Sequence, residues 1–191
     1  MPTVSTRPTD ETLLLALDLG NTTWKLGFTV GGPAKPPRIR TTPARDLTRL
    51  RAEVTAAKVR FGLSSDAPVV SCYEAARDGF WRHRALPTLG VTNLVVDSAS
   101  IEGNRRRREA KSDRLDTAAL LAKLSRHVSG ERGVWSVVNV PAVEDEDRRQ
   151  LHRELFTMTR ERSRVVSRIK GLLALHGIIL ETRGLLHVLP G

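Results

Sequence analysis

The amino-acid sequence predicts an α/β fold in which helices flank a mixed sheet, followed by a long helix of the coiled-coil type. Two observations predict the sheet: short apolar runs follow one another near the N-terminus, and further runs then alternate with helical spacings. A third observation predicts the long helix, because apolar residues recur near the C-terminus at alternating steps of four and three.

Three strands and a helix are expected first. Residues 12–18 (TLLLALD) form an apolar run of strand length, a Gly-Asn pair supplies a turn, and residues 24–30 alternate as a second strand. After glycine and proline breaks, residues 38–42 predict a third strand, and residues 47–61 carry apolar side chains at helical spacing. The predicted order up to this point is three strands and one helix.

The later elements are predicted to alternate. We expect strands at residues 68–73, 93–97 and 134–140, and helices at residues 78–86 and 113–127. Three strands, a helix and then alternating strands and helices is the element order of the ribonuclease H-like fold. The sequence therefore predicts a ribonuclease H-like sheet.

A change of pattern near Pro141 predicts a domain boundary. Residues 1–11 are expected to be a flexible polar arm, residues 12–140 one domain, and residues 141–191 a linker with a coiled-coil helix. Gly177 is expected to end that helix. Arg162 and His176 interrupt its apolar seam, which favours a partner helix that offers a carboxylate or a phosphate. The seam comprises Leu151, Leu155, Met158, Arg162, Val165, Ile169, Leu172 and His176.

Composition narrows the possible partners and the compartment. The 191 residues include 31 Lys+Arg and 21 Asp+Glu, a formal net charge of +10, which favours a nucleic-acid partner. Basic residues cluster at residues 105–108 and 148–170, and for each of these clusters a solvent-exposed helix face is the alternative interpretation. The single cysteine, Cys72, excludes an intrachain disulfide and a zinc site built from cysteines. With neither a signal segment nor an apolar run of about 20 residues, we expect a cytoplasmic protein without a membrane partner.

Four acidic residues are candidates for a metal site: Asp18 at the end of the first strand, Glu74 after the fourth, and Asp113 and Asp116 on the later helix. Phosphodiester chemistry by two metal ions needs several carboxylates close together. The helical spacing places Asp113 and Asp116 on the stripe of the apolar residues that follow them. Alternatively, the two acids only complement the helix dipole, with Ser112 as cap.

The segment from Asp18 to Lys25 has a competing interpretation. It resembles the first phosphate-binding loop of acetate, sugar and pantothenate kinases and of actin-like ATPases. This alternative predicts a phosphotransferase that binds ATP through Asp18, Thr22 and Lys25.

Several segments together resemble the DEDD transposases of insertion sequences, relatives of the Piv invertases and of bridge-RNA-guided recombinases. The most specific element is Lys-Ser-Asp-Arg-Leu-Asp at residues 111–116. The other segments that carry the resemblance are residues 73–81, 93–97, 105–110, 140–141, 160–162 and 168–173.

The resemblance implies a RuvC-like domain with Asp18, Glu74, Asp113 and Asp116 in the family's four acidic positions. It further implies cleavage and exchange of DNA strands with Mg²⁺, or with Mn²⁺ in its place, and a guide (bridge) RNA. The family's C-terminal domain with a serine nucleophile would lie beyond Gly191, so we expect a truncated transposase that associates as a homo-oligomer through its C-terminal helix. A binding module that leaves the chemistry to a partner chain is the alternative. Nucleic-acid contacts are predicted at Arg105, Arg106, Arg107, Arg108, Lys111, Arg114, Arg160, Arg164 and Arg168.

Overall fold

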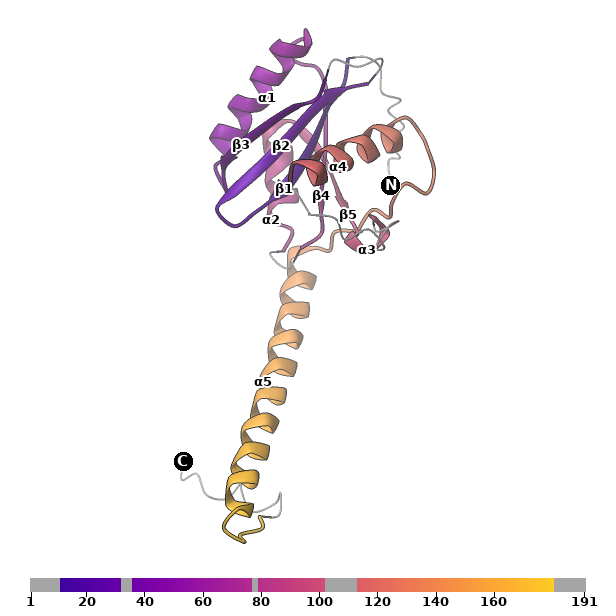
Figure 1. Ribbon diagram of the computed structural model, residues 1–191. Helices are drawn as coiled ribbons and strands as arrows, with labels where there is room; N and C mark the ends of the chain where they lie inside the picture. Colours follow the sequence, from indigo (N-terminus) through magenta and orange to yellow (C-terminus); the bar gives the residue numbers. More distant parts are fainter. Residues whose placement is uncertain (1–10, 32–35, 77–78, 102–112, 181–191) are drawn as a thin grey trace. The chain divides into compact units, whose positions relative to one another are not determined.

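The computed structural model describes residues 11–31, 36–76, 79–101 and 113–180, with the backbone alone at residues 101 and 113–116 (Figure 1). The chain divides into two units, Met1–Val140 and Pro141–Gly191. The first unit contains the sheet and the helices that cover it, and the second contains one long helix.

The first unit is built on a five-stranded mixed sheet with the order β3-β2-β1-β4-β5. Its central strand, β1, pairs antiparallel with β2 and parallel with β4, while β3 is antiparallel to β2 and β5 is parallel to β4. This order confirms the predicted ribonuclease H-like class. The strands are β1 (Leu13–Leu19), β2 (Thr23–Val30), β3 (Arg38–Pro43), β4 (Val69–Glu74) and β5 (Val91–Val96).

The central strand explains the continuous apolar run seen in the sequence. All residues of β1 from Leu13 to Leu17 are buried, because helices cover both faces of the sheet. The turn into β2 needs a glycine, since a Cβ on Gly20 would lie 2.7 Å from the carbonyl oxygen of Thr23. The same carbonyl accepts a hydrogen bond from the Gly20 N–H at 3.1 Å, which closes the hairpin.

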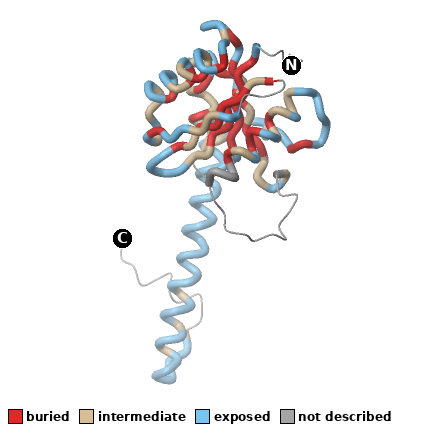
Figure 2. The backbone as a smooth tube through the Cα atoms, turned by 45° about the horizontal axis from the view of Figure 1, so that its top comes forward, coloured by how far each residue is buried: buried red, intermediate tan, exposed pale blue. Residues whose placement is uncertain are grey.

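Two separate cores lie on the two faces of the sheet. One face packs against α1 (Leu47–Phe61), α2 (Trp81–Ala85) and the 3₁₀ turn Leu86–Leu89, and the other packs against α4 (Asp113–Val128). Figure 2 shows the buried residues concentrated in the sheet and on the helix faces turned to it. Alternate residues of β1, β4 and β5 therefore belong to different cores.

Three expected elements differ from the structure. The helix expected at residues 78–86 is shorter and passes into a 3₁₀ turn, because Pro87 cannot donate to a continuing α-helix. The strand expected at residues 134–140 is wrong: only a bridge between Val137 and Val96 forms. Val134 and Trp135 are adjacent in sequence and both bury their side chains in the α4 core, so the alternation of a strand is lost there, while Val138 packs on the opposite core. A short helix, α3 (Ser98–Ile101), was not predicted.

The second unit is dominated by α5 (Val143–Ala174), a helix of 32 residues that contains no buried residue. It begins eight residues before the apolar seam, and Glu144, Asp145 and Glu146 in its first turn complement the positive end of the helix dipole. It ends where the Ile178 N–H donates to the Leu173 carbonyl and Gly177 adopts φ +71°. No helix in the described residues is long and apolar enough to cross a lipid bilayer.

Candidate active site

Asp18 and Glu74 lie on two adjacent parallel strands, β1 and β4, at the same end of the sheet. Leu17 and Tyr73 are Cα partners in the parallel pair of β1 and β4, and each acid is the next residue in its strand. Because side chains alternate with a period of two, acids at matching positions of parallel strands point to the same face. Asp18 is half-buried and Glu74 is exposed, so the pair borders solvent.

The face that carries these acids is the one covered by α4. Ala16 and Cys72 lie two residues before Asp18 and Glu74, and both are buried in the core under α4. Burial raises the pKa of the Cys72 thiol far above its ordinary value, and the negative charge of Glu74 raises that pKa further. The acids therefore stand at the edge of an apolar floor, and the thiol in that floor stays protonated.

A close contact fixes where α4 crosses the sheet. Gly27 is the Cα partner of Ala16, and a Cβ on this glycine would lie 2.8 Å from Cγ2 of the buried Thr117. Thr117 directly follows the first turn of α4, which contains Asp113 and Asp116. The backbone thus brings the helix turn with the other two acids onto the face of Asp18 and Glu74. The side chains of Asp113 and Asp116 lie outside the described residues.

Lys25 places a positive charge on the same face. It is the Cα partner of Asp18 in the antiparallel pair of β1 and β2, and both residues are half-buried. Cross-strand partners point to the same face of a sheet, and Gly27, two residues later, faces α4. The site therefore combines carboxylates from adjacent parallel strands with a lysine from the neighbouring antiparallel strand.

The donor chemistry of the acids suits a hard divalent cation, because Mg²⁺ is bound through carboxylate oxygens. Among the residues whose side chains the structure describes, no group of three or more His, Cys, Asp or Glu forms a metal-binding cluster. Asp18 and Glu74 are the two members of the predicted set whose side chains fall within that description. They supply two carboxylates at one edge of the sheet.

The predicted nucleic-acid contacts fall in two groups. Arg105, Arg106, Arg107, Arg108 and Lys111 lie outside the described residues, as does the side chain of Arg114. Arg160, Arg164 and Arg168 are exposed on α5 and recur every four residues, so they form one stripe of that helix. The Arg160 guanidinium lies over the Phe156 ring, 5.4 Å from its centroid.

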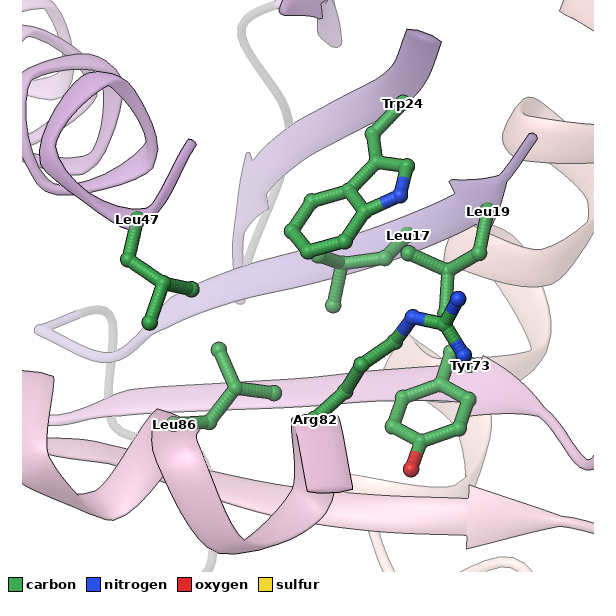
Figure 3. Close-up of a pocket in the computed structure, with 7 residues that line it drawn as sticks. All are labelled: Leu17, Leu19, Trp24, Leu47, Tyr73, Arg82 and Leu86. Atoms are coloured by element: carbon green, nitrogen blue, oxygen red, sulfur yellow. The ribbon is translucent and has the colours of Figure 1, made fainter. Parts of the chain in front are cut away.

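An apolar pocket lies on the opposite face of the sheet (Figure 3), and the buried charge in it was not predicted from the sequence. Arg82 enters it from α2, and its guanidinium lies 5.0 Å from the Trp81 ring centroid and 5.8 Å from that of Trp24. In the sequence, the one indication that Arg82 is buried is the adjacent Trp81. The pocket is lined by Leu17, Leu19, Trp24, Leu47, Tyr73, Arg82 and Leu86.

The sheet order and the two acids at its edge define a ribonuclease H-like α/β domain. Over 168 residues, 87% of its length, the chain is 36% identical to a protein of Sinorhizobium fredii (strain NBRC 101917 / NGR234) described as "Putative transposase y4rJ". The chain spans 42% of the length of that relative. This homology confirms the predicted relationship to transposases.

No protein-family model matches the chain. A structure described as Thermus thermophilus RuvC has a TM-score of 0.39 at 13% identity, and one of T. thermophilus RuvC in complex with a Holliday junction substrate has a TM-score of 0.38 at 12% identity. Each likeness covers 66% of this chain and 99% of the RuvC chain.

Proposed function

We propose that the chain is the metal-dependent, DNA-processing domain of an insertion-sequence transposase, with Asp18, Glu74, Asp113 and Asp116 as its metal ligands. One observation carries the proposal: Asp18 and Glu74 follow paired residues of adjacent parallel strands, on the face that α4 covers. The relationship to a putative transposase supports DNA as the substrate. The same site would cleave and exchange DNA strands during transposition.

The residues around the acids have separate roles in this proposal. Bound Mg²⁺, or Mn²⁺ in its place, would stabilise the charge that develops on a phosphodiester group during strand cleavage. The four carboxylates would hold the ions, and the apolar floor of Ala16 and Cys72 would exclude water beneath them. The Lys25 ammonium would offset part of the carboxylate repulsion while the site holds no metal.

A magnesium titration tests the metal site. Mg²⁺ at about 100 times its dissociation constant is expected to stabilise the folded chain by about 2.7 kcal/mol, because it binds the native state alone. Asp18→Asn and Asp113→Asn are each expected to remove most of this gain in the free energy of unfolding. The measurement is thermal unfolding of the full chain at increasing MgCl₂.

Asp66→Asn is the matched control, since Asp66 is an exposed acid in the loop before β4. It is expected to leave the gain unchanged. If Mg²⁺ does not change the free energy of unfolding while the chain still binds DNA, the metal site would be contradicted and the alternative of a nucleic-acid-binding module would be favoured.

The exposed arginines of α5 are proposed to contact the phosphate backbone of DNA or of a guide RNA. At about 100° per residue, Arg160 lies opposite the apolar seam and Arg164 lies away from it, whereas Arg168 lies beside the seam, about 40° from Leu172. Arg160 and Arg164 can thus contact a phosphate while the seam serves another partner. If each arginine neutralises one phosphate, each contact contributes about 0.9 to the slope of log affinity against log salt.

The apolar seam of α5 is proposed to pair with a second copy of the chain. Leu155, Met158 and Val165 are all exposed in the single chain, and a seam at steps of four and three is typical of helices that pack in coiled coils. Leu155→Glu is expected to lower the molar mass seen in sedimentation equilibrium toward that of one chain. Thr157→Glu adds the same charge on the other side of the helix and is expected to leave the mass unchanged. Equal masses for the native chain and Leu155→Glu would contradict this pairing.

A further inference from the structure

Three arginines surround a single carboxylate where β3 and α1 meet. The Arg38 Nη2 donates to Glu53 Oε2 at 3.0 Å, and the Arg38 Nη1 donates to the Ala56 carbonyl at 3.4 Å. Arg40 Nε lies 3.8 Å from the same Glu53 oxygen, and Arg49 Nη2 lies 3.7 Å from the other. Three positive charges thus face one negative charge, and the cluster carries a surplus of two.

The sequence brings these residues together through local structure. Arg38 and Arg40 alternate on β3, so they point to the same side of the strand. A short turn then leads to α1, whose first turn is capped when Asp46 Oδ1 accepts from the Arg49 N–H at 2.8 Å. Helix α1 runs back beside β3 (Figure 1), which places Arg49 and Glu53, one turn apart, near the strand arginines.

Burial differs sharply within the cluster. The side chains of Glu53 and Arg38 are 12% and 15% exposed, whereas those of Arg40 and Arg49 are 53% and 60% exposed. Within the described part of the chain, the guanidinium groups of Arg40 and Arg49 donate no hydrogen bond. Their contacts with Glu53 are longer than a hydrogen bond. Glu53 therefore attracts the two guanidinium groups without accepting a hydrogen bond from either of them.

We propose that Arg40 and Arg49 form a binding site for the phosphate backbone of duplex DNA at the β3 edge of the sheet, separate from the acidic residues. The choice of DNA as the ligand rests on the proposed function. A planar guanidinium presents parallel N–H donors that match phosphate oxygens, and a surplus of two charges suits two neighbouring phosphates. The half-buried Glu53 attracts both guanidinium groups to this place before the ligand arrives, which lowers the entropy lost on binding.

The test measures binding of the full chain to a duplex of about 25 base pairs, in EDTA, at a series of salt concentrations. The double substitution Arg40→Ala and Arg49→Ala is expected to reduce the slope of log affinity against log salt by about 1.8, since each lost phosphate contact removes about 0.9. The control removes Arg51 and Arg60, two exposed arginines of the same helix that lie outside the cluster, and is expected to change the slope by much less.

A second variant separates a role in binding from a role in folding. Arg40→Lys with Arg49→Lys keeps both charges, so its slope is expected to stay near that of the native chain while its affinity falls. The proposal would be overturned if the alanine double variant and its control change the slope equally, or if the alanine double variant leaves the slope unchanged. It would also be overturned if the native chain does not bind the duplex. EDTA removes the metal from the assay, so failure of the acidic site does not affect this result.

Discussion

Trp24→Ala is expected to lower the free energy of unfolding by about 3–5 kcal/mol, the largest effect among these substitutions. Trp24 is 1% exposed at the start of β2 and lines the pocket on the α1 face of the sheet (Figure 3). Its ring centroid lies 6.0 Å from that of Trp81, and the Arg82 guanidinium lies over it. Alanine would remove all of these contacts and leave a cavity at the strand end. Urea unfolding followed by circular dichroism measures the loss.

Phe156→Ala provides the matched control for this aromatic deletion. Phe156 is 64% exposed on α5, so its removal is expected to change the free energy of unfolding by less than about 0.5 kcal/mol. A loss below about 1 kcal/mol for Trp24→Ala would mean that Trp24 does not anchor the core on the α1 face.

Gly27→Ala is expected to lower the free energy of unfolding by about 1–3 kcal/mol. An alanine in a strand is ordinarily more stable than a glycine by about 0.5–1 kcal/mol, so the sign of the effect is diagnostic. The new Cβ would lie 2.8 Å from Thr117 Cγ2 and 3.4 Å from Ile39 Cδ1, inside a packed core. Relief of this contact would move the start of α4 away from the sheet, so Mg²⁺ is also expected to stabilise this variant less. Thermal unfolding with and without MgCl₂ measures both effects.

Two further variants make this prediction specific. The additional change Thr117→Ser removes Cγ2 and is expected to restore part of the lost stability in Gly27→Ala. Gly171→Ala is the control of opposite sign: Gly171 lies inside α5, nothing lies within 4 Å of an added Cβ, and alanine is expected to stabilise that helix by about 1 kcal/mol. A stabilising Gly27→Ala would show that α4 does not rest on β2 at this position.

The sequence predicted most of the sheet because apolar periodicity reports which residues are buried. The run of β1 and the alternation of β2 gave the right strands, since each has a simple pattern of buried faces. The segment around Val137 is also apolar, but the adjacent residues Val134 and Trp135 pack in the same core, and only one bridge, between Val137 and Val96, forms. An apolar composition does not distinguish such a segment from a strand.

The candidate site could be predicted only in part. The placement of Asp18 and Glu74 followed from strand ends, whereas the positions of Gly27 and Lys25 depend on the register of β1 against β2, which the apolar pattern of the two strands does not specify. Arg82 was missed for a related reason, because a charged residue is expected at the surface unless its aromatic neighbours in space are known. The Glu53 cluster also joins residues from two elements.

The absence of buried residues along α5 bears on how that helix becomes ordered. Most helices in proteins draw their stability from packing one apolar face, and an isolated helix in water is only marginally stable. For residues 143–174, helix content and the capture of a partner should therefore form a single coupled equilibrium. Dilution of the protein would then lower the helix content of this segment, while binding of several chains to one ligand would raise it.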